Sequence, residues 1–299
     1  MKTKIFLTLL LLLFKGISAF AQDDRLSQIF SNPLFINPAY AGSLGCSRAT
    51  LNYRQNIPYN NSEYLAFNTA YDQYVKPIYG GVGIQLATNH FFYKDVTTID
   101  GAYAYNFNVN DNLHIRPAIK LGLGYLDYDW TKSGMPINNY STQYFNLGAG
   151  ILVSYKSLVA GVSSNHINRP DIGNVGESRL PSKWIIHANY QFDINEKTIL
   201  TPGIFGSKQL DAYEIVYNLS LKYDFLKAGI GFRQGFNYSD GFILMLGYCN
   251  NWMSVGYSFE NTMSHLLNKA DGIHEITVAF KFNCKNDKET FKITQPFGF

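Results

Sequence analysis

The sequence predicts an all-β protein, a transmembrane up-and-down antiparallel β-barrel of about 14 strands with a short N-terminal plug or periplasmic segment. Three observations predict this fold. Apolar residues recur at every second position from about residue 47 to residue 282, the period of a strand with one apolar face. Most runs have the roughly 9–11 residues that a tilted strand needs to cross a bilayer. Several runs begin or end in Tyr, Trp or Phe, as in the aromatic girdles of membrane barrels.

Residues 1–21 are predicted to be a signal peptide. Lys2 and Lys4 precede an apolar stretch over residues 5–14, and residues 19–21 (Ala-Phe-Ala) match a signal-peptidase cleavage site. Beyond this segment no run approaches 18 apolar residues, so the sequence excludes a membrane protein built from helices.

Residues 22–46 lie outside the period-two pattern. Two Asn-Pro steps occur here, and they favour a fixed extended or turning path over a helix across the segment. The density of Phe, Ile, Leu and Tyr argues against a disordered leader. We expect either a plug folded into the lumen or a strap on the periplasmic rim. The candidate plug residues are Asn32, Pro33, Asn37, Pro38 and Ala39.

The barrel is predicted to span residues 47–282, followed by a C-terminal periplasmic tail at 283–299. One of the clearest alternations runs from 113 to 125, and comparable runs give about 14 strands. The predicted strand starts lie near Arg48, Tyr64, Gly81, Thr97, Leu113, Tyr144, Leu158, Lys183, Thr198, Ala212, Leu226, Gly241, Trp252 and His274.

The connections between these runs alternate in length. The tight turns fall at 110–111, 156–157, 195–196 and 250–251, and the longest loops at about 131–143, 168–182 and 261–273. Short turns on one rim and long loops on the other are typical of outer-membrane barrels. Because an even number of strands returns the chain to the side it left, both termini are expected to be periplasmic.

A soluble β-sandwich would also show alternation, but its strands are usually about 5–6 residues long. Its core would also have to hold too many charges. The charged residues on the inward face are Arg48, Arg54, Asp72, Asp100, Arg116, Lys120, Glu214, Lys222, Lys227, Arg233, Glu275 and Lys281. In a membrane barrel they face a wet lumen, while Ile119, Tyr217 and Ile230 face lipid. The pattern therefore favours the barrel.

Charge and cysteine usage exclude several classes of partner. Removing residues 1–21 takes away three lysines and no acid, which leaves 22 basic and 22 acidic residues. A neutral chain without a basic stripe is not expected to bind nucleic acid. Cys46, Cys249 and Cys284 show no metal-ligand spacing, so they are apolar filler or include one adventitious disulfide. No metal and no cofactor is expected.

An enzyme on a barrel would need a nucleophile or activated water with a supported base. The best local cluster is His166 with Asp171 and Ser163 or Ser164, but no strained elbow presents either serine. His274 and Glu275 are adjacent on a strand and point to opposite faces, so they form no dyad. We expect no catalytic residues.

Several short blocks, taken in order, resemble the PorP/SprF family. The opening block is residues 32–42, followed by Tyr53-Arg54-Gln55. Asn56 departs from the family pattern, which has a tryptophan nearby. The later blocks are Ala160-Gly161-Val162-Ser163, His166, Asn168-Arg169-Pro170, Leu180-Pro181 before His187 and Tyr190, Phe232-Arg233-Gln234, Val255-Gly256-Tyr257-Ser258 and Gly272-Ile273-His274-Glu275-Ile276.

This family comprises outer-membrane components of the type IX secretion and gliding machinery of the Bacteroidetes. The resemblance implies a barrel that helps to export or anchor secreted proteins, such as adhesins, without being the translocation pore. It implies three partners: a secreted protein with a type IX C-terminal domain, periplasmic or lipoprotein components of the machinery, and outer-membrane lipid.

Apolar and aromatic residues in the long loops predict where a partner binds. The candidates are Met135, Ile137, Tyr140, Met263, Leu266 and Leu267, together with Asp171. We expect these loops to hold the exported domain, while segment 22–46 and the tail meet periplasmic machinery.

The alternative function is a transporter of small apolar substrates that resembles the long-chain fatty-acid channels. The run 242–248 is apolar on both faces, with Ile243 and Met245 on the lumen side. These two residues either line an apolar pocket or pack against the N-terminal segment. We favour packing.

Overall fold

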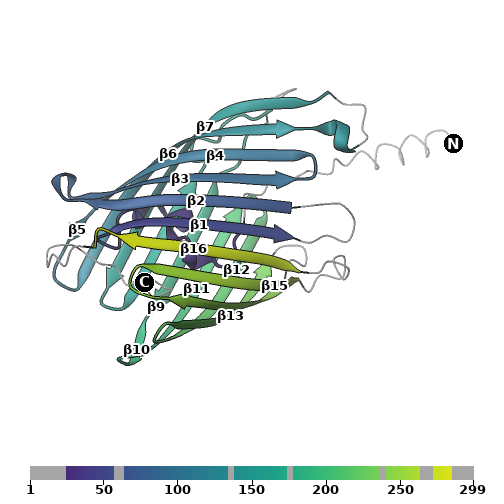
Figure 1. The fold of residues 1–299 in the computed structure, drawn as a ribbon. Coiled ribbons are helices and arrows are strands. Elements are labelled where there is room, and N and C mark those ends of the chain that lie inside the picture. The colour runs from purple at the N-terminus through teal and green to yellow at the C-terminus, as the bar shows by residue number, and fades with distance from the viewer. Residues whose placement is uncertain are drawn as a thin grey trace, which may run out of the picture.

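The alternating residues form a closed antiparallel barrel in the computed structural model, which describes residues 25–56, 64–133, 138–173, 178–235, 240–262 and 272–284 (Figure 1). The strands are β1 (Ser47–Asn56), β2 (Tyr64–Val75), β3 (Gly80–Phe91), β4 (Lys94–Tyr105), β5 (Phe107–Asn108), β6 (Leu113–Tyr128), β7 (Tyr140–Tyr155), β8 (Leu158–Asn165), β9 (Lys183–Tyr190), β10 (Phe192–Asn195), β11 (Thr198–Gln209), β12 (Ala212–Tyr223), β13 (Leu226–Gly235), β14 (Gly241–Cys249), β15 (Met253–Thr262) and β16 (Ile273–Phe282).

These segments make 14 barrel strands, as predicted. The short β5 continues β4 along β6, and β10 continues β9 along β11. The barrel closes where β1 pairs with β16, from Ser47 opposite Phe282 to Asn56 opposite Ile273. The largest error in a predicted strand start is at β7, which begins at Tyr140 and not near Tyr144.

One rim of the barrel carries the short connections at 76–79, 109–112, 156–157, 196–197, 224–225 and 250–252, and we call it the turn rim. The opposite loop rim carries the connections at 57–63, 129–139, 166–182, 236–240 and 263–272. Two hairpins on the loop rim are also tight, so the predicted alternation in length is not strict. In the hairpin at 210–211, Leu210 adopts a φ of 54°, as tight β-turns often require.

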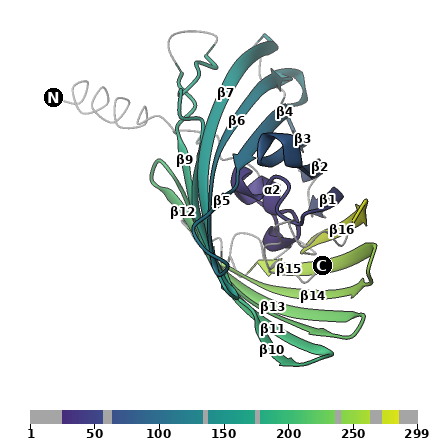
Figure 2. The same cartoon turned by 90° about the vertical axis from the view of Figure 1, so that its left-hand side faces the viewer.

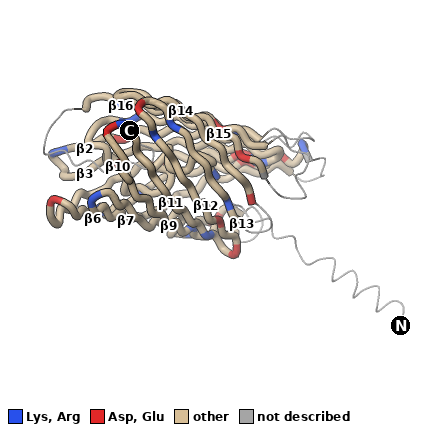
Figure 3. The backbone as a smooth tube through the Cα atoms, turned by 90° about the horizontal axis from the view of Figure 1, so that it is seen from below, with Lys and Arg blue, Asp and Glu red and all other residues tan. Residues whose placement is uncertain are grey.

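The two faces of the wall differ as predicted. Ile119 and Ile230 are 55% and 57% exposed on the outside, whereas Ser220 is buried. Ten of the twelve predicted inward charges are buried, and Lys222 and Lys281 are half-buried. Figure 3 shows acidic and basic positions interspersed among neutral ones along the barrel.

Residues 25–46, which we call the inner segment, lie inside the barrel (Figure 2). They form three short helical turns: η1 (Ile29–Ser31), α2 (Pro33–Ile36) and η2 (Pro38–Tyr40). The segment therefore follows a turning path made of short turns of three or four residues and not one helix across its length. Each proline occupies the first position of a turn, where its missing N–H is not needed. Among the described helices, none is long and apolar enough to cross a membrane.

The inner segment runs through the lumen from one rim to the other. Arg25 lies beside Arg54 and Glu214, which are within three residues of strand ends at the loop rim. Cys46 precedes β1 at the turn rim, where Cys284 follows β16. The periplasmic placement of both termini stays a prediction, because the termini themselves lie outside the described residues. The even strand count returns Phe282 to the rim of Ser47, but the chain has already crossed the lumen before β1 begins.

Candidate functional site

The first turn of the inner segment is held by charged wall residues at the loop rim. This charge cluster consists of Arg25, Arg54, Glu214, Arg233, Glu260 and Glu275. The carboxylate of Glu275 accepts hydrogen bonds from the backbone N–H groups of Ser27 (2.6 Å) and Gln28 (2.9 Å). Arg233 donates to the carbonyl oxygen of Leu26 at 2.7 Å. The wall thus binds the backbone of this first turn, and the side chains of Ser27 and Gln28 also donate hydrogen bonds to the wall.

Within the charge cluster each buried charge has an opposite partner. Arg233 donates to Glu214 at 2.5 Å and to Glu260 at 2.7 Å. Arg54 lies 3.6 Å from Glu260 and 3.7 Å from Glu275. Buried ions need such partners because their desolvation is costly. The cluster therefore closes this side of the lumen as a fixed structure.

The second Asn-Pro step inserts a side chain between two wall strands. The Nδ2 of Asn37 donates to the carbonyl oxygens of Ile151 (3.1 Å) and Val162 (3.2 Å), and its Oδ1 accepts from Ala39 N. A Cβ at either neighbouring glycine, Gly150 or Gly161, would collide with the Asn37 amide. The inner segment therefore fits here because both wall positions lack a side chain.

The last part of the inner segment is bound near the turn rim. Arg116 donates to the carbonyl oxygens of Ala39 and Ala41, and Asp72 accepts from the N–H of Gly42 at 2.8 Å. Gly42 adopts a φ of +65°, and a Cβ there would clash with the wall. Opposite it, a Cβ at Gly81 would collide with the carbonyl group of Ala41.

Apolar residues of the inner segment pack on β14, the strand whose run 242–248 is apolar on both faces. Ile243 and Met245 belong to one buried cluster with Ile29, Phe30 and Ile36. The preference for packing over an open apolar pocket at these two residues is confirmed. Ser163, considered as a nucleophile, donates to the carbonyl oxygen of Ile36 at 2.7 Å and so also holds the segment.

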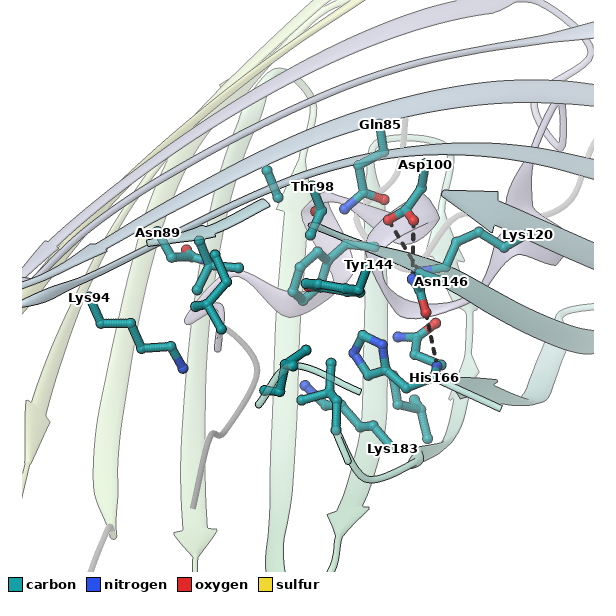
Figure 4. Close-up of a pocket in the computed structure, with 18 of the residues that line it drawn as sticks. Gln85, Asn89, Lys94, Thr98, Asp100, Lys120, Tyr144, Asn146, His166 and Lys183 are labelled. Carbon is teal, nitrogen blue, oxygen red and sulfur yellow. Dashed lines mark hydrogen bonds and ion pairs between the residues drawn. The ribbon is translucent and has the colours of Figure 1, made fainter. Parts of the chain in front are cut away.

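A cavity of about 100 Å³ remains on the other side of the lumen, between β3, β4, β6, β7 and β9 (Figure 4). Its apolar wall includes Leu126, Tyr144, Leu180 and Ile185, all buried. Phe35 is the residue through which the inner segment reaches it.

The polar side of this cavity is an ordered network. Asp100 lies 3.4 Å from the Nζ of Lys120 and accepts from the Nδ2 of Asn146 at 3.1 Å. The Oδ1 of Asn146 in turn accepts from the backbone N–H of His166 at 3.1 Å. Gln85, Lys94 and Lys183 also line the cavity (Figure 4). The sequence placed Asp100 and Lys120 in the lumen but did not reveal that their strands leave a space.

Two predicted partner-binding residues hold the loop at 166–182, which lies over the cavity. The hydroxyl of Tyr140 donates to the carbonyl oxygen of Gly173 at 2.7 Å and so fastens this loop to β7. The carboxylate of Asp171 accepts from the backbone N–H groups of Gly173 and Ser178, which hold the pKa of Asp171 below its ordinary value. Both residues order the loop. The other five predicted loop residues, Met135, Ile137, Met263, Leu266 and Leu267, lie outside the described residues.

A disulfide joins Cys46 to Cys284, beside the seam between β1 and β16. Cys249 is buried in β14. The sequence left open whether any disulfide forms, because two of the three cysteines are 238 residues apart and meet only when the barrel closes.

Family comparison agrees with this architecture. A model of the type IX secretion system membrane protein PorP/SprF matches residues 18–280. The chain belongs to this family. The PorP/SprF assignment and the barrel together make it an outer-membrane component of type IX secretion, as the sequence motifs implied. No curated protein matches the chain in sequence.

Solved structures with a similar fold are outer-membrane channels. The TodX monoaromatic hydrocarbon channel deltaS2 mutant has a TM-score of 0.57 at 10% identity, covering 85% of this chain and 94% of its own. The CymD monoaromatic hydrocarbon channel has a TM-score of 0.54 at 11% identity, with 84% and 93% covered. The toluene transporter TbuX of Ralstonia pickettii has a TM-score of 0.53 at 11% identity, with 83% and 92% covered. At this identity the likeness concerns the fold alone.

Proposed function

We propose that this barrel holds exported proteins at its loop rim and contacts periplasmic or lipoprotein components of the type IX machinery at its turn rim. The observation that carries the proposal is the inner segment, which is bound at both ends and along its length inside the lumen. A barrel filled in this way is suited to a scaffold and not to an open pore for a polypeptide.

The placement of the connections supports a docking role for the loop rim. The connections at 129–139, 166–182 and 263–272 all leave the barrel there. Long loops on a rigid barrel are common sites of partner binding. We infer that Met135, Ile137, Met263, Leu266 and Leu267 provide apolar contacts for a type IX C-terminal domain, with Tyr140 and Asp171 ordering the loop base.

The turn rim is proposed to face the periplasm, with the tail at 283–299 in contact with the machinery. The inner segment is not proposed for that contact, because its residues 26–44 are nearly all buried within the barrel. The Cys46–Cys284 disulfide is compatible with an oxidising compartment.

Deletion of residues 263–268 tests the docking role. The variant is expected to assemble as a heat-modifiable barrel but to lose surface display of the secreted protein that co-purifies with the wild type. A matched control replaces the turn residues Asn110 and Asp111 on the opposite rim with Gly-Gly. Unchanged display after shortening each of the three loops in turn would contradict the proposal.

A second candidate is transport of a small apolar substrate, favoured by the lumen cavity and by the similarity in fold to monoaromatic hydrocarbon channels. In liposomes containing the purified barrel, this function predicts toluene uptake faster than in protein-free liposomes. The scaffold function predicts equal rates.

A further inference from the structure

The strand β7 extends beyond its neighbour β8 at the loop rim. β7 has 16 residues and pairs with β6 along its whole length. β8 has 8 residues, and its ladder with β7 reaches only as far as Ala149. Residues 140–148 therefore pair with β6 alone among the described strands, and their other edge faces no strand (Figure 1).

This edge of β7 carries backbone groups without partners. In an antiparallel ladder the N–H and C=O of one residue point to the same side, and successive residues point to opposite sides. Leu147 points away from β6, because its N–H and C=O both bond to the loop at 166–182. Phe145, Gln143 and Ser141 point the same way. Within the described residues no hydrogen bond reaches the N–H of Phe145 or the backbone groups of Gln143 and Ser141.

The loop at 166–182 covers only the start of this edge. The side-chain amide of Asn168 donates to the carbonyl oxygen of Phe145 at 2.6 Å. Pro170 follows, and it has no N–H to offer to β7. Its carbonyl oxygen accepts from the N–H of Leu180 within the loop itself. The loop therefore does not take the place of the missing strand.

The side chains around the open edge indicate that it lies in water. Ser141 and Gln143 are exposed on the outer face. Ser141 lies opposite Asp127 of β6, which in turn lies opposite Asp95 of β4. Charged side chains on the outer face are destabilising within the hydrocarbon layer, and unpaired backbone groups are not tolerated there. The edge therefore stands above the hydrocarbon layer, on the rim that carries the long loops.

The sequence of this edge has none of the features that discourage strand pairing. Natural edge strands commonly carry Lys, Pro or a bulge. Residues 140–146 (Tyr-Ser-Thr-Gln-Tyr-Phe-Asn) contain no charge, no Gly and no Pro, and their register with β6 has no bulge. An uncharged run of β-forming residues with open backbone groups is a template for another strand.

We propose that residues 141–145 of β7 bind an extended strand of the exported protein, which joins the sheet beside β7. The proposal rests on the docking function of the loop rim and specifies one of its contacts. Backbone hydrogen bonds provide the affinity in such strand addition. A second copy of this chain fits less well, because two barrels in one membrane point the same way. Their β7 edges could meet only in parallel, the slightly less stable pairing.

Hydrogen–deuterium exchange resolved to single amides tests the edge in the full-length barrel, alone and with the purified secreted protein that co-purifies with the wild type. The amides of Gln143 and Phe145 are expected to exchange within seconds in the free barrel and at least tenfold more slowly in the complex. The amide of Tyr144 faces β6 and is the control, protected in both states. Protection of Gln143 and Phe145 in the free barrel, or no slowing in the complex, would overturn the proposal.

A proline on the open edge tests the contact by binding. Gln143→Pro removes an N–H that has no partner in the free barrel, so barrel stability is expected to change little. Each lost hydrogen bond raises the Kd for the secreted protein about three- to tenfold. Gln143→Thr keeps the N–H and is the matched control, expected to bind like the wild type. If Gln143→Pro does not assemble, the exchange measurement on the wild type decides.

Deletion of residues 263–268 separates this proposal from the docking function on which it rests. Binding that the deletion weakens but Gln143→Pro does not would overturn strand addition alone. Binding that neither change weakens would contradict the docking function as well.

Discussion

The two sides of the lumen beneath the loops are built from similar residues and have opposite character. On the side of β12 to β16, buried carboxylates and Arg233 bind the backbone of the inner segment, which closes the space. On the side of β3 to β9, Asp100 and Lys120 are also paired, but among the described residues that line the cavity there only Phe35 comes from the inner segment. A space remains there.

The difference shows what an inward charge does in this barrel. Glu275 meets two backbone N–H groups and so fixes the segment. The Oε1 atom of Gln85 accepts no hydrogen bond from the described part of the chain, and Gln85 lines a cavity instead. The neighbouring backbone, not the residue type, decides whether a lumen residue supports the inner segment or lines a cavity.

The largest expected effect comes from breaking the charge cluster. Arg233→Met leaves Glu214 and Glu260 buried without their main partner, which is expected to cost about 3–5 kcal/mol of unfolding free energy. Urea unfolding of the barrel from detergent or lipid measures it. The control is Lys132→Met, which removes an exposed pair with Asp129 and is expected to change stability by about 0–1 kcal/mol. Similar losses of unfolding free energy in both variants would show that the charge cluster does not stabilise the barrel more than an exposed ion pair does.

Loss of the disulfide is expected to have the next largest effect. Cys284→Ser frees the turn-rim end of the inner segment from β16, with an expected loss of about 2–4 kcal/mol. Cys249→Ser is the matched control for loss of a thiol. If reducing agent lowers the stability of Cys284→Ser as much as that of the wild type, the Cys46–Cys284 bond is not responsible.

A methyl group added where the inner segment packs on β3 is expected to lower the free energy of unfolding by a smaller amount. Gly81→Ala introduces a methyl group against the carbonyl group of Ala41, for about 1–3 kcal/mol. Gly101→Ala is its control, because the nearest atom to that Cβ, a backbone oxygen of Leu121, is 3.9 Å away. Equal stability of the two variants would mean that the segment is not seated against β3.

The smallest effect concerns the loop over the cavity and depends on pH. Hydrogen bonds from Gly173 and Ser178 hold the pKa of Asp171 below its ordinary value of 3.8. Its ordering contribution is therefore fully present above that value and is lost as the pH falls through the depressed pKa. Asp171→Ala should speed hydrogen exchange at Gly173 and Ser178 near neutral pH. Unchanged exchange at these two amides would show that Asp171 does not order the loop.

The fold was largely predictable because the alternation of apolar and polar residues within each strand distinguishes its lipid face from its lumen face. Alternation located the inward charges and Ile119 on the outer wall without any knowledge of their neighbours. The course of residues 25–46 was less predictable. Asn37 is identified by the Asn-Pro step, but its partners Gly150 and Gly161 lie on strands more than a hundred residues away. The cavity lies where the inner segment does not fill the lumen. Its position depends on how distant parts of the chain pack, so no local sequence pattern predicts it.

Hydrogen–deuterium exchange of the inner segment in the folded barrel tests the central claim most directly. If residues 25–46 are a fixed part of the lumen, the amides of Ser27, Gln28 and Gly42 will be protected as strongly as those of β1, because Glu275 and Asp72 bind them. Exchange of these three amides within seconds, with β1 still protected, would contradict the account and leave the lumen open.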